Sequence, residues 1–555
     1  MIAAGGRAWV LAACAALGAC VTLEPPAPSA SRDYADYLIG RVASAREDHA
    51  AAADRYFGAL TRAPNDDQLI SGALYTSLAL GDEARARQAA RMAARENGPA
   101  LAHIVRAADA LRAGAWRRAD TETDRAQGAA YEELIARTIH LWARVGEGRV
   151  DDVLVQLEPL ASMRPYGGLF AYQQAIALDY AGRTDAARAA FSVGAGGGLW
   201  LPAAIERHAD LLARSGDQAA ALALLSDEAS TRGNPALRAA LARAQAGQAP
   251  ARTRVTPARG AAIGLYGLAT IFTQEHDPAS ALIALSVALM LDPSLDEARL
   301  AFAQAQAERG NQAVALAALA QVPASSPYAS SANVAQAWAL LDEGQEEAAL
   351  AQVSALAGAG DERAARALAD MYRRLGRDGE AEAIYSRMIE SDAHNWRLYF
   401  ARAAARDRMG RWPDAEADLQ QALALSPDQP DVLNYLGYSW ADRGERLSEA
   451  LAMIERAVEM RPLSAAVIDS LGWVHFRMGD YAEALRHLER AVELQPDDAT
   501  LNDHLGDVYW RLGRRIEARF QWRRALALAP ENAAALEAKI ADGLAPERGA
   551  RTATR

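Results

Sequence analysis

Two consecutive stretches of this sequence follow one pattern of 34 residues. Residues 465–498 read AAVIDSLGWVHFRMGDYAEALRHLERAVELQPDD, and residues 499–532 read ATLNDHLGDVYWRLGRRIEARFQWRRALALAPEN. Both place Leu-Gly at positions 7 and 8, Gly at 15, Ala at 20 and 27, and Pro at 32. A repeat of this length is typical of a helix–turn–helix unit that buries its apolar face by stacking on its neighbours.

This spacing resembles the tetratricopeptide repeat, which implies an all-α superhelical solenoid whose concave face holds other proteins. Weaker copies of the pattern follow the chain at 33–66, 262–295, 362–395, 396–429 and 430–464. Further glycines recur every 32 to 36 residues and are expected to be turns within helix pairs: Gly81, Gly114, Gly146, Gly182 and Gly216.

The shared positions have a packing role. Small residues at positions 8, 20 and 27 let two helices approach closely, and apolar residues at 4, 7, 11 and 24 form the seam between them. Gly at 15 permits the backbone conformation that ends the first helix, and Pro at 32 stops the second. These residues are therefore predicted to be structural and not part of a binding site.

The first twenty residues predict secretion and lipid attachment. Arg7 precedes an apolar run at 8–17, which is shorter than the roughly 20 apolar residues that a membrane span needs. Residues 17–20 read Leu-Gly-Ala-Cys and resemble the lipobox of bacterial lipoproteins. The resemblance implies a signal peptide over 1–19 and acylation of Cys20. The alternative is an ordinary signal peptide with an incidental cysteine.

The rest of the chain divides by composition. A Pro-rich tether is expected at the start of the mature chain, and the segment AGQAPARTRVTPARG looks like a linker, because it lacks apolar periodicity. The predicted parts are the tether 20–32, N-terminal degenerate helical repeats 33–245, the linker 246–260, C-terminal tetratricopeptide repeats 261–540 and a disordered tail 541–555.

Composition argues against several classes of protein. The net charge is −12, whereas nucleic-acid binding calls for a basic stripe. Lys539 is the only lysine, so the phosphate-binding and kinase motifs that need one are missing. Neither an HExxH motif nor a Cys/His cluster occurs. We expect no enzyme, cofactor, metal or small-molecule substrate, although an enzyme with an unrecognised site in the N-terminal half stays an alternative.

The predicted binding surface lies on the first helix of each C-terminal repeat. In tetratricopeptide units, positions 2, 5, 9 and 12 of that helix face the groove, and the aromatic, Asn and Asp side chains found there suit an extended peptide. The alternative is that Trp473 and Trp510 cover the next repeat's helix. The predicted groove residues are Arg397, Phe400, Asp431, Asn434, Tyr438, Asp469, Trp473, Phe476, Asp503, Asp507 and Trp510.

Three stretches carry a closer resemblance: LNYLGYSWADRG (433–444), IDSLGWVHFRMGDYAEAL (468–485) and LNDHLGDVYWRLGRRIEARFQWRRAL (501–526). They are similar to the C-terminal repeats of proteobacterial outer-membrane tetratricopeptide lipoproteins. Some members are adaptors of periplasmic carboxyl-terminal processing proteases. The resemblance implies a lipid anchor at the periplasmic face of the outer membrane and protein partners, such as an envelope protease. An assembly factor for pili, secretion or outer-membrane proteins is the alternative.

Overall fold

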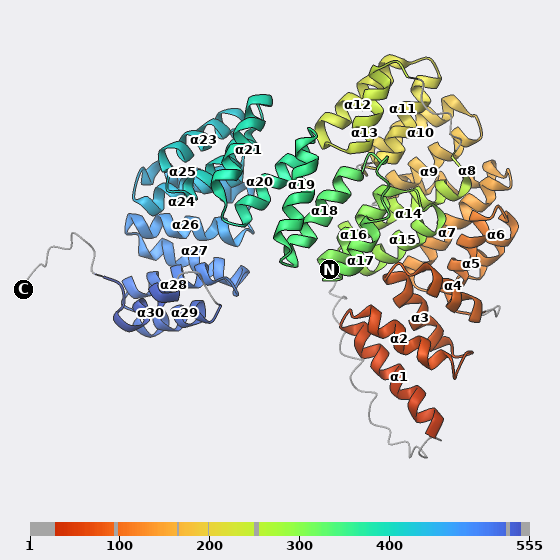
Figure 1. The fold of residues 1–555 in the computed structure, drawn as a ribbon, viewed down its shortest axis with the longest axis horizontal. Helices are drawn as coiled ribbons and strands as arrows, with labels where there is room; N and C mark the ends of the chain where they lie inside the picture. The colour runs from red at the N-terminus through yellow and green to blue at the C-terminus, as the bar shows by residue number, and fades with distance from the viewer. Residues whose placement is uncertain are drawn as a thin grey trace, which may run out of the picture. The chain divides into compact units, whose positions relative to one another are not determined.

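The computed structural model of the protein describes residues 28–93, 98–163, 166–197, 199–248, 255–528 and 533–545. Over these residues its regular structure is entirely helical, which confirms the predicted fold class (Figure 1). The chain divides into two compact units, Met1–Ala349 (unit 1) and Leu350–Arg555 (unit 2). The predicted signal peptide, Cys20 and most of the predicted tail lie outside the described residues.

Unit 1 starts with consecutive antiparallel helix pairs. These pairs are α1 (Pro28–Ala45), α2 (His49–Leu60), α3 (Asp67–Ala79), α4 (Glu83–Met92), α5 (Ala100–Arg112), α6 (Trp116–Arg125), α7 (Ala130–Gly146), α8 (Val150–Leu157), α9 (Gly167–Tyr180) and α10 (Thr184–Gly196), with the short 3-10 helix η1 (Leu160–Ser162) before α9. The later helices are α11 (Pro202–Arg214), α12 (Gln218–Arg232), α13 (Pro235–Gln245), α14 (Pro257–Gln274), α15 (Pro278–Leu291), α16 (Asp296–Glu308), α17 (Gln312–Leu319) and α18 (Ala329–Asp342).

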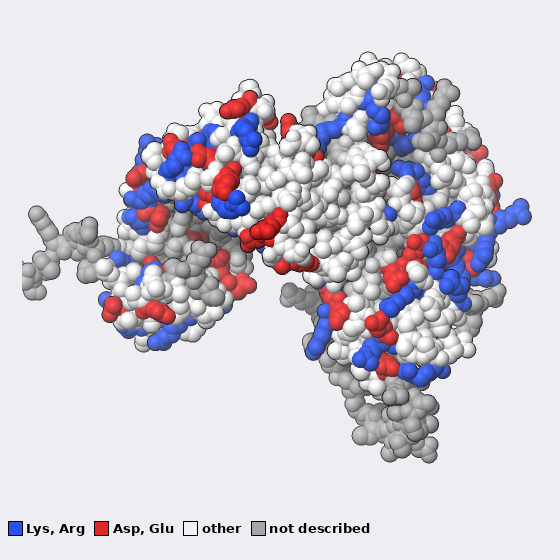
Figure 2. All heavy atoms as spheres, in the orientation of Figure 1, with Lys and Arg blue, Asp and Glu red and all other residues white. Residues whose placement is uncertain are grey.

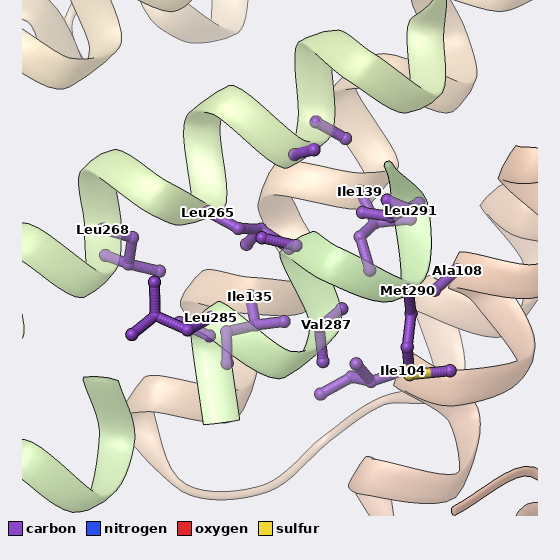
Figure 3. Close-up of a cluster of buried hydrophobic side chains, with 14 of the residues drawn as sticks. Ile104, Ala108, Ile135, Ile139, Leu265, Leu268, Leu285, Val287, Met290 and Leu291 are labelled. Atoms are coloured by element: carbon purple, nitrogen blue, oxygen red, sulfur yellow. The ribbon is translucent and has the colours of Figure 1, made fainter. Parts of the chain in front are cut away.

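The helix pair α14–α15 fills the inner face of the first repeats. Helix α14 packs against α5, α7 and α9, and α15 packs against α3 and α5. These partners are the first helices of successive pairs, the helices that line the inner face of a repeat superhelix. Figure 3 shows Leu265 of α14 and Val287 of α15 among the apolar side chains that meet there. The Ser286 hydroxyl also donates a hydrogen bond to the Leu78 carbonyl of α3.

The sequence of this pair explains its burial. Residues 280–288 of α15 are all buried, as expected of a helix that is apolar on every side. The glycines of α14 face large side chains. A Cβ atom at Gly260 would lie 2.3 Å from the Trp142 ring, and one at Gly267 would lie 2.6 Å from Leu169. Glycine therefore lets the α14 backbone approach α7 and α9 closely.

The observed organisation differs from the predicted one in three places. Helix α14 begins at Pro257, inside the expected linker 246–260, and it leads into the core of unit 1. The two compact units meet after Ala349, about ninety residues beyond that linker. Helix α1 begins at Pro28, inside the expected tether 20–32. Apolar burial of α14 and α15 moves the boundary, because a helix pair packed inside unit 1 belongs to that unit.

Glycines with positive φ make the turns within helix pairs, as the repeat spacing predicted. They include Gly81, Gly114, Gly182, Gly216, Gly444, Gly479 and Gly513. One predicted turn residue is displaced: Gly146 is the last residue of α7, and Gly148, at φ +82°, makes the turn. A Cβ atom at Gly146 would lie 2.6 Å from the Trp116 ring, so this glycine serves close packing.

Unit 2 is a regular stack of helix pairs. Its helices are α19 (Glu346–Gly358, which begins in unit 1), α20 (Glu362–Arg374), α21 (Asp378–Ser391), α22 (Trp396–Arg408), α23 (Trp412–Leu425), α24 (Pro430–Arg443), α25 (Leu447–Met460), α26 (Ala465–Met478), α27 (Tyr481–Leu494), α28 (Ala499–Arg511), α29 (Arg515–Ala527) and α30 (Ala533–Asp542). Acidic and basic side chains alternate over α23–α25 on the face drawn in Figure 2.

The seam of unit 2 confirms the packing roles predicted for the repeat positions. A Cβ atom at Gly472 would lie 2.6 Å from Leu488, and one at Gly506 would lie 2.5 Å from Trp522. Such distances leave no room for a larger residue at position 8. The alanines at positions 20 and 27 of the last two repeats are fully buried. Small residues thus set the distance between paired helices.

Candidate functional site

The predicted groove residues lie on the first helices of four successive pairs in unit 2. Helix α22 carries Arg397 and Phe400, α24 carries Asp431, Asn434 and Tyr438, α26 carries Asp469, Trp473 and Phe476, and α28 carries Asp503, Asp507 and Trp510. Their exposure divides them into two groups. The accessible group comprises the residues of α22 and α24 together with Phe476, and the buried group comprises the others.

The accessible group presents charged and aromatic side chains. Arg397 is exposed, and Phe400 is half-buried with its ring edge-on to Tyr435 at 5.8 Å between centroids. Asp431 is exposed and accepts hydrogen bonds from the guanidinium of Arg461 at 2.6 and 2.8 Å. Aromatic rings that are held in place but still reachable are the residues that dominate binding at protein interfaces.

Asn434 and Tyr438 lie one turn apart on α24. The Oδ1 atom of Asn434 is buried and has no hydrogen-bond partner among the described residues. Burial raises the pKa of Tyr438, and the carboxylates of Asp442 and Asp469 raise it further, so the phenol stays a protonated donor. Of the two residues, the half-buried Tyr438 can donate its phenol hydrogen to the backbone of an extended chain, whereas burial closes the Asn434 oxygen to a partner.

The buried group centres on His504, which the sequence analysis did not single out. The Trp473 ring stacks on His504 at 4.0 Å and on Phe476 at 4.8 Å between centroids. Nδ1 of His504 lies 2.9 Å from a carboxylate oxygen of Asp469. Trp473 is only 8% exposed as a result. The cluster therefore ties α26 to α28.

The charge state of His504 follows from its neighbours. Burial lowers the pKa of His504, but the carboxylates of Asp469, Asp507 and Asp503 together raise it above its ordinary value. The raised pKa favours the protonated imidazole beside Asp469. An ion pair with little exposure on either side contributes most when both partners keep their hydrogen bonds, and removing one partner is costly.

A second buried network closes the C-terminal end of the stack. The Lys539 ammonium of α30 donates to Asp503 at 2.6 Å and to Asp507 at 2.9 Å. The indole N–H of Trp522 donates to Asp507 at 2.9 Å. Trp510 is 8% exposed, with its ring 5.3 Å from that of Trp522. Helix α30 thus covers the side chains of α28 that would otherwise face a further repeat.

The burial of these five residues gives them a role within the stack. Their contact with a partner stays a prediction. The alternative was that Trp473 and Trp510 cover the next repeat's helix: the Trp473 ring does stack on His504 of α28, whereas the Trp510 ring lies against Trp522 of its own repeat. The contacts of His504 and Lys539 could have been predicted from their spacing in the sequence. Each follows an acidic residue of the preceding helix pair by about one repeat, which places the two side chains on neighbouring first helices.

Unit 2 also contains a recess between α20, α21 and α22, with α19 at its edge. Its volume is about 410 Å³, and Leu368, Ile384 and Leu398 contribute apolar lining. Glu362 and Arg387 contribute charged lining. The recess could accept an apolar side chain of a bound protein.

The described residues were also searched for metal sites and membrane-spanning helices. Among them, no group of three or more His, Cys, Asp or Glu side chains is placed to hold a metal ion. Within the same ranges, no helix combines the length and apolarity that crossing a membrane requires.

Comparison with known proteins identifies the repeats. A family described as tetratricopeptide repeat matches residues 400–466, and one described as TPR repeat matches residues 472–513. These matches and the helix-pair geometry define the class of this protein: an all-α solenoid with tetratricopeptide repeats, an architecture that serves as a scaffold for protein–protein interaction.

A curated relative shares part of these repeats. A TPR repeat-containing protein of Pseudomonas aeruginosa is 35% identical over 85 residues. The match covers 15% of this chain and 14% of the length of the relative. The match therefore supports the assignment of tetratricopeptide repeats, and it does not establish the activity of the whole chain.

Several solved structures match part of this chain. A tetratricopeptide repeat protein from Parabacteroides merdae is 15% identical, with a TM-score of 0.34, over 50% of this chain and 97% of that one. A TPR protein of Thermus thermophilus is 22% identical, with a TM-score of 0.29, over 33% and 98%. MamA from Desulfovibrio magneticus is 18% identical, with a TM-score of 0.27, over 30% and 94%.

Proposed function

We propose that this chain is a lipid-anchored adaptor at the periplasmic face of the bacterial outer membrane. Unit 2 would hold an envelope protease and bring its substrates to it. The observation that carries the binding role is the accessible group on α22 and α24, where the half-buried rings of Phe400 and Tyr438 lie beside the exposed charges of Arg397 and Asp431. The lipobox and the resemblance to adaptor lipoproteins support the anchor and the class of partner.

The binding role is assigned to unit 2 because the corresponding face of the N-terminal repeats is occupied. Helices α14 and α15 pack against the first helices of α3–α4, α5–α6, α7–α8 and α9–α10. A partner would have to displace the core of unit 1 to bind there. The first helices of unit 2 keep reachable side chains, including Arg397 and Phe400.

Phe400→Ala and Tyr438→Ala are each expected to weaken partner capture roughly 30-fold, because a reachable interface aromatic contributes about 2 kcal/mol or more. The measurement is capture of periplasmic proteins by the purified chain, identified by mass spectrometry and then titrated. Tyr372→Ala is the matched control, since Tyr372 is also half-buried in unit 2 but lies outside the predicted group. Equal capture by all three variants would remove the binding role from α22 and α24.

The identity of the captured protein tests the finer part of the proposal. A processing protease, recovered together with its substrates, supports the adaptor role. Recovery of pilus, secretion or outer-membrane assembly components in place of a protease would support an assembly factor. Either result leaves the repeat class unchanged, because that class rests on the fold and on the family matches.

Cys20→Ser is expected to release the chain from outer membranes after a high-salt wash, without changing its helical content. The reason is that the proposed acyl group on Cys20 is the salt-resistant attachment. Membrane fractionation and circular dichroism give the two readouts. A variant that stays with the outer membrane after the wash contradicts the anchor.

A further inference from the structure

Helix α29 of unit 2 presents an apolar stripe to solvent. Ile516 is 84% exposed and Phe520 is 61% exposed. Residues four apart lie on one face of a helix, so the side chains of Ile516 and Phe520 form one apolar stripe on α29. Large apolar side chains scattered singly are ordinary on protein surfaces, whereas a stripe on one helix is not.

The same positions in the preceding repeats show that packing does not require this stripe. Ile516 and Phe520 occupy repeat positions 18 and 22. Position 18 is Ala482 in the preceding repeat and position 22 is Arg486, and both are exposed. In the repeat at 396–429, the residues at positions 18 and 22 are Pro413 and Ala417, which are also exposed and small. The large apolar residues are therefore a departure of the last full repeat.

Basic side chains flank the stripe. Arg523 and Arg524 are exposed, and no ion pair to either is found among the described residues. Arg519 lies over the Trp510 ring and donates a hydrogen bond to the Ile540 carbonyl. Neither contact supplies a carboxylate that would neutralise the guanidinium. The one acidic residue of α29, Glu517, pairs with Arg514 at 3.1 Å. The face around the stripe therefore carries positive charge.

We propose that this face of α29 docks on an anionic lipid surface. Two neighbouring apolar side chains with arginines at their sides are the arrangement by which a helix lies in the interface of a membrane. The apolar pair enters the headgroup region, and the guanidiniums contact lipid phosphates. The docking is separate from the proposed acylation of Cys20 and from the partner-binding face, so it can fail while both of those stand.

The first test is flotation of the full chain with vesicles of phosphatidylcholine, alone or mixed with phosphatidylglycerol. Every sample carries Cys14→Ser and Cys20→Ser, which exclude acylation. Binding is expected with the anionic vesicles, and high salt should weaken it. Arg523→Glu should lower that binding about five-fold or more, as should Arg524→Glu.

The apolar stripe is tested in the same way. Ile516→Ser and Phe520→Ser should each reduce binding to the anionic vesicles several-fold. Val155→Ser is the control, because Val155 is an equally exposed apolar residue of unit 1. Equal binding of the Phe520→Ser and Val155→Ser variants would overturn the proposal, as would failure of the parent chain to bind anionic vesicles.

A site-specific label separates this contact from any other attachment of the chain. With both native cysteines replaced, Phe520→Cys carries the only thiol for an environment-sensitive fluorophore. Anionic vesicles should shift its emission to the blue, and spin-labelled lipids should quench it. The matched control is Arg486→Cys, at the same position of the preceding repeat. A label at 520 that behaves like the label at 486 overturns the proposal and leaves an acidic protein as the occupant to test.

Discussion

Gly260→Leu is expected to destabilise unit 1 by about 3 kcal/mol or more, at the upper end of what overpacking costs. The leucine Cβ alone would lie 2.3 Å from the Trp142 ring, and that ring is 2% exposed. Trp142 cannot move aside freely, because its indole N–H donates to the Gln173 side chain. Urea unfolding followed by circular dichroism measures the loss.

The control for this prediction is another helical glycine with open space. A Cβ atom at Gly58 of α2 would meet nothing within 4 Å. Gly58→Leu should therefore be neutral or stabilising by up to about 1 kcal/mol, through helix propensity alone. If the two variants unfold at the same urea concentration, α14 does not pack on α7 as described.

Asp469→Ala is expected to destabilise unit 2 by about 3–5 kcal/mol near pH 6, the cost of leaving a buried charge without its partner. The Nδ1 atom of His504 would lose its carboxylate at 2.9 Å, and the Trp473 ring covers the site from water. Asp497→Ala is the control, because Asp497 is exposed. It should change the free energy of unfolding by no more than about 0.5 kcal/mol.

The effect of Asp469→Ala on the free energy of unfolding should depend on pH in a definite direction. In the native chain the pKa of His504 is raised, so its stabilising contribution is fully present below the unfolded pKa of 6.5. That contribution is lost as the pH rises through the folded pKa. Without Asp469, burial is opposed only by Asp507 and Asp503, so the pKa of His504 should fall relative to the native chain, and the stability difference between the two chains should be largest at acid pH. A stability difference that does not grow toward acid pH would contradict the ion pair.

Much of the fold follows from the repeat pattern alone. Gly472 and the buried alanines at positions 20 and 27 have the packing roles that their spacing predicted. Gly479 takes the left-handed conformation at the expected end of the first helix. These features could be predicted because they depend on contacts within one helix pair or between adjacent pairs. The spacing of a single repeat therefore records them.

The candidate site was only partly predictable, because the exposure of its residues depends on side chains from other repeats. The pattern places Tyr438 and Trp473 on equivalent faces of α24 and α26, and the structure leaves the first half-buried and buries the second. The difference comes from His504, one helix pair further along, which stacks on Trp473 and pairs with Asp469. The residue pattern of one repeat does not predict which side chains of the next repeat will cover it.

The sequence by itself determined an all-helical stack of pairs, with its turns and seams and the line of residues on the first helices. Only the tertiary structure decided that α14 and α15 fill the inner face of the N-terminal repeats. The physical reason is that an apolar helix such as α15 must be buried somewhere, and its sequence does not say against what. The nearest large apolar surface was the inner face formed by α3 and α5, more than 150 residues earlier in the chain.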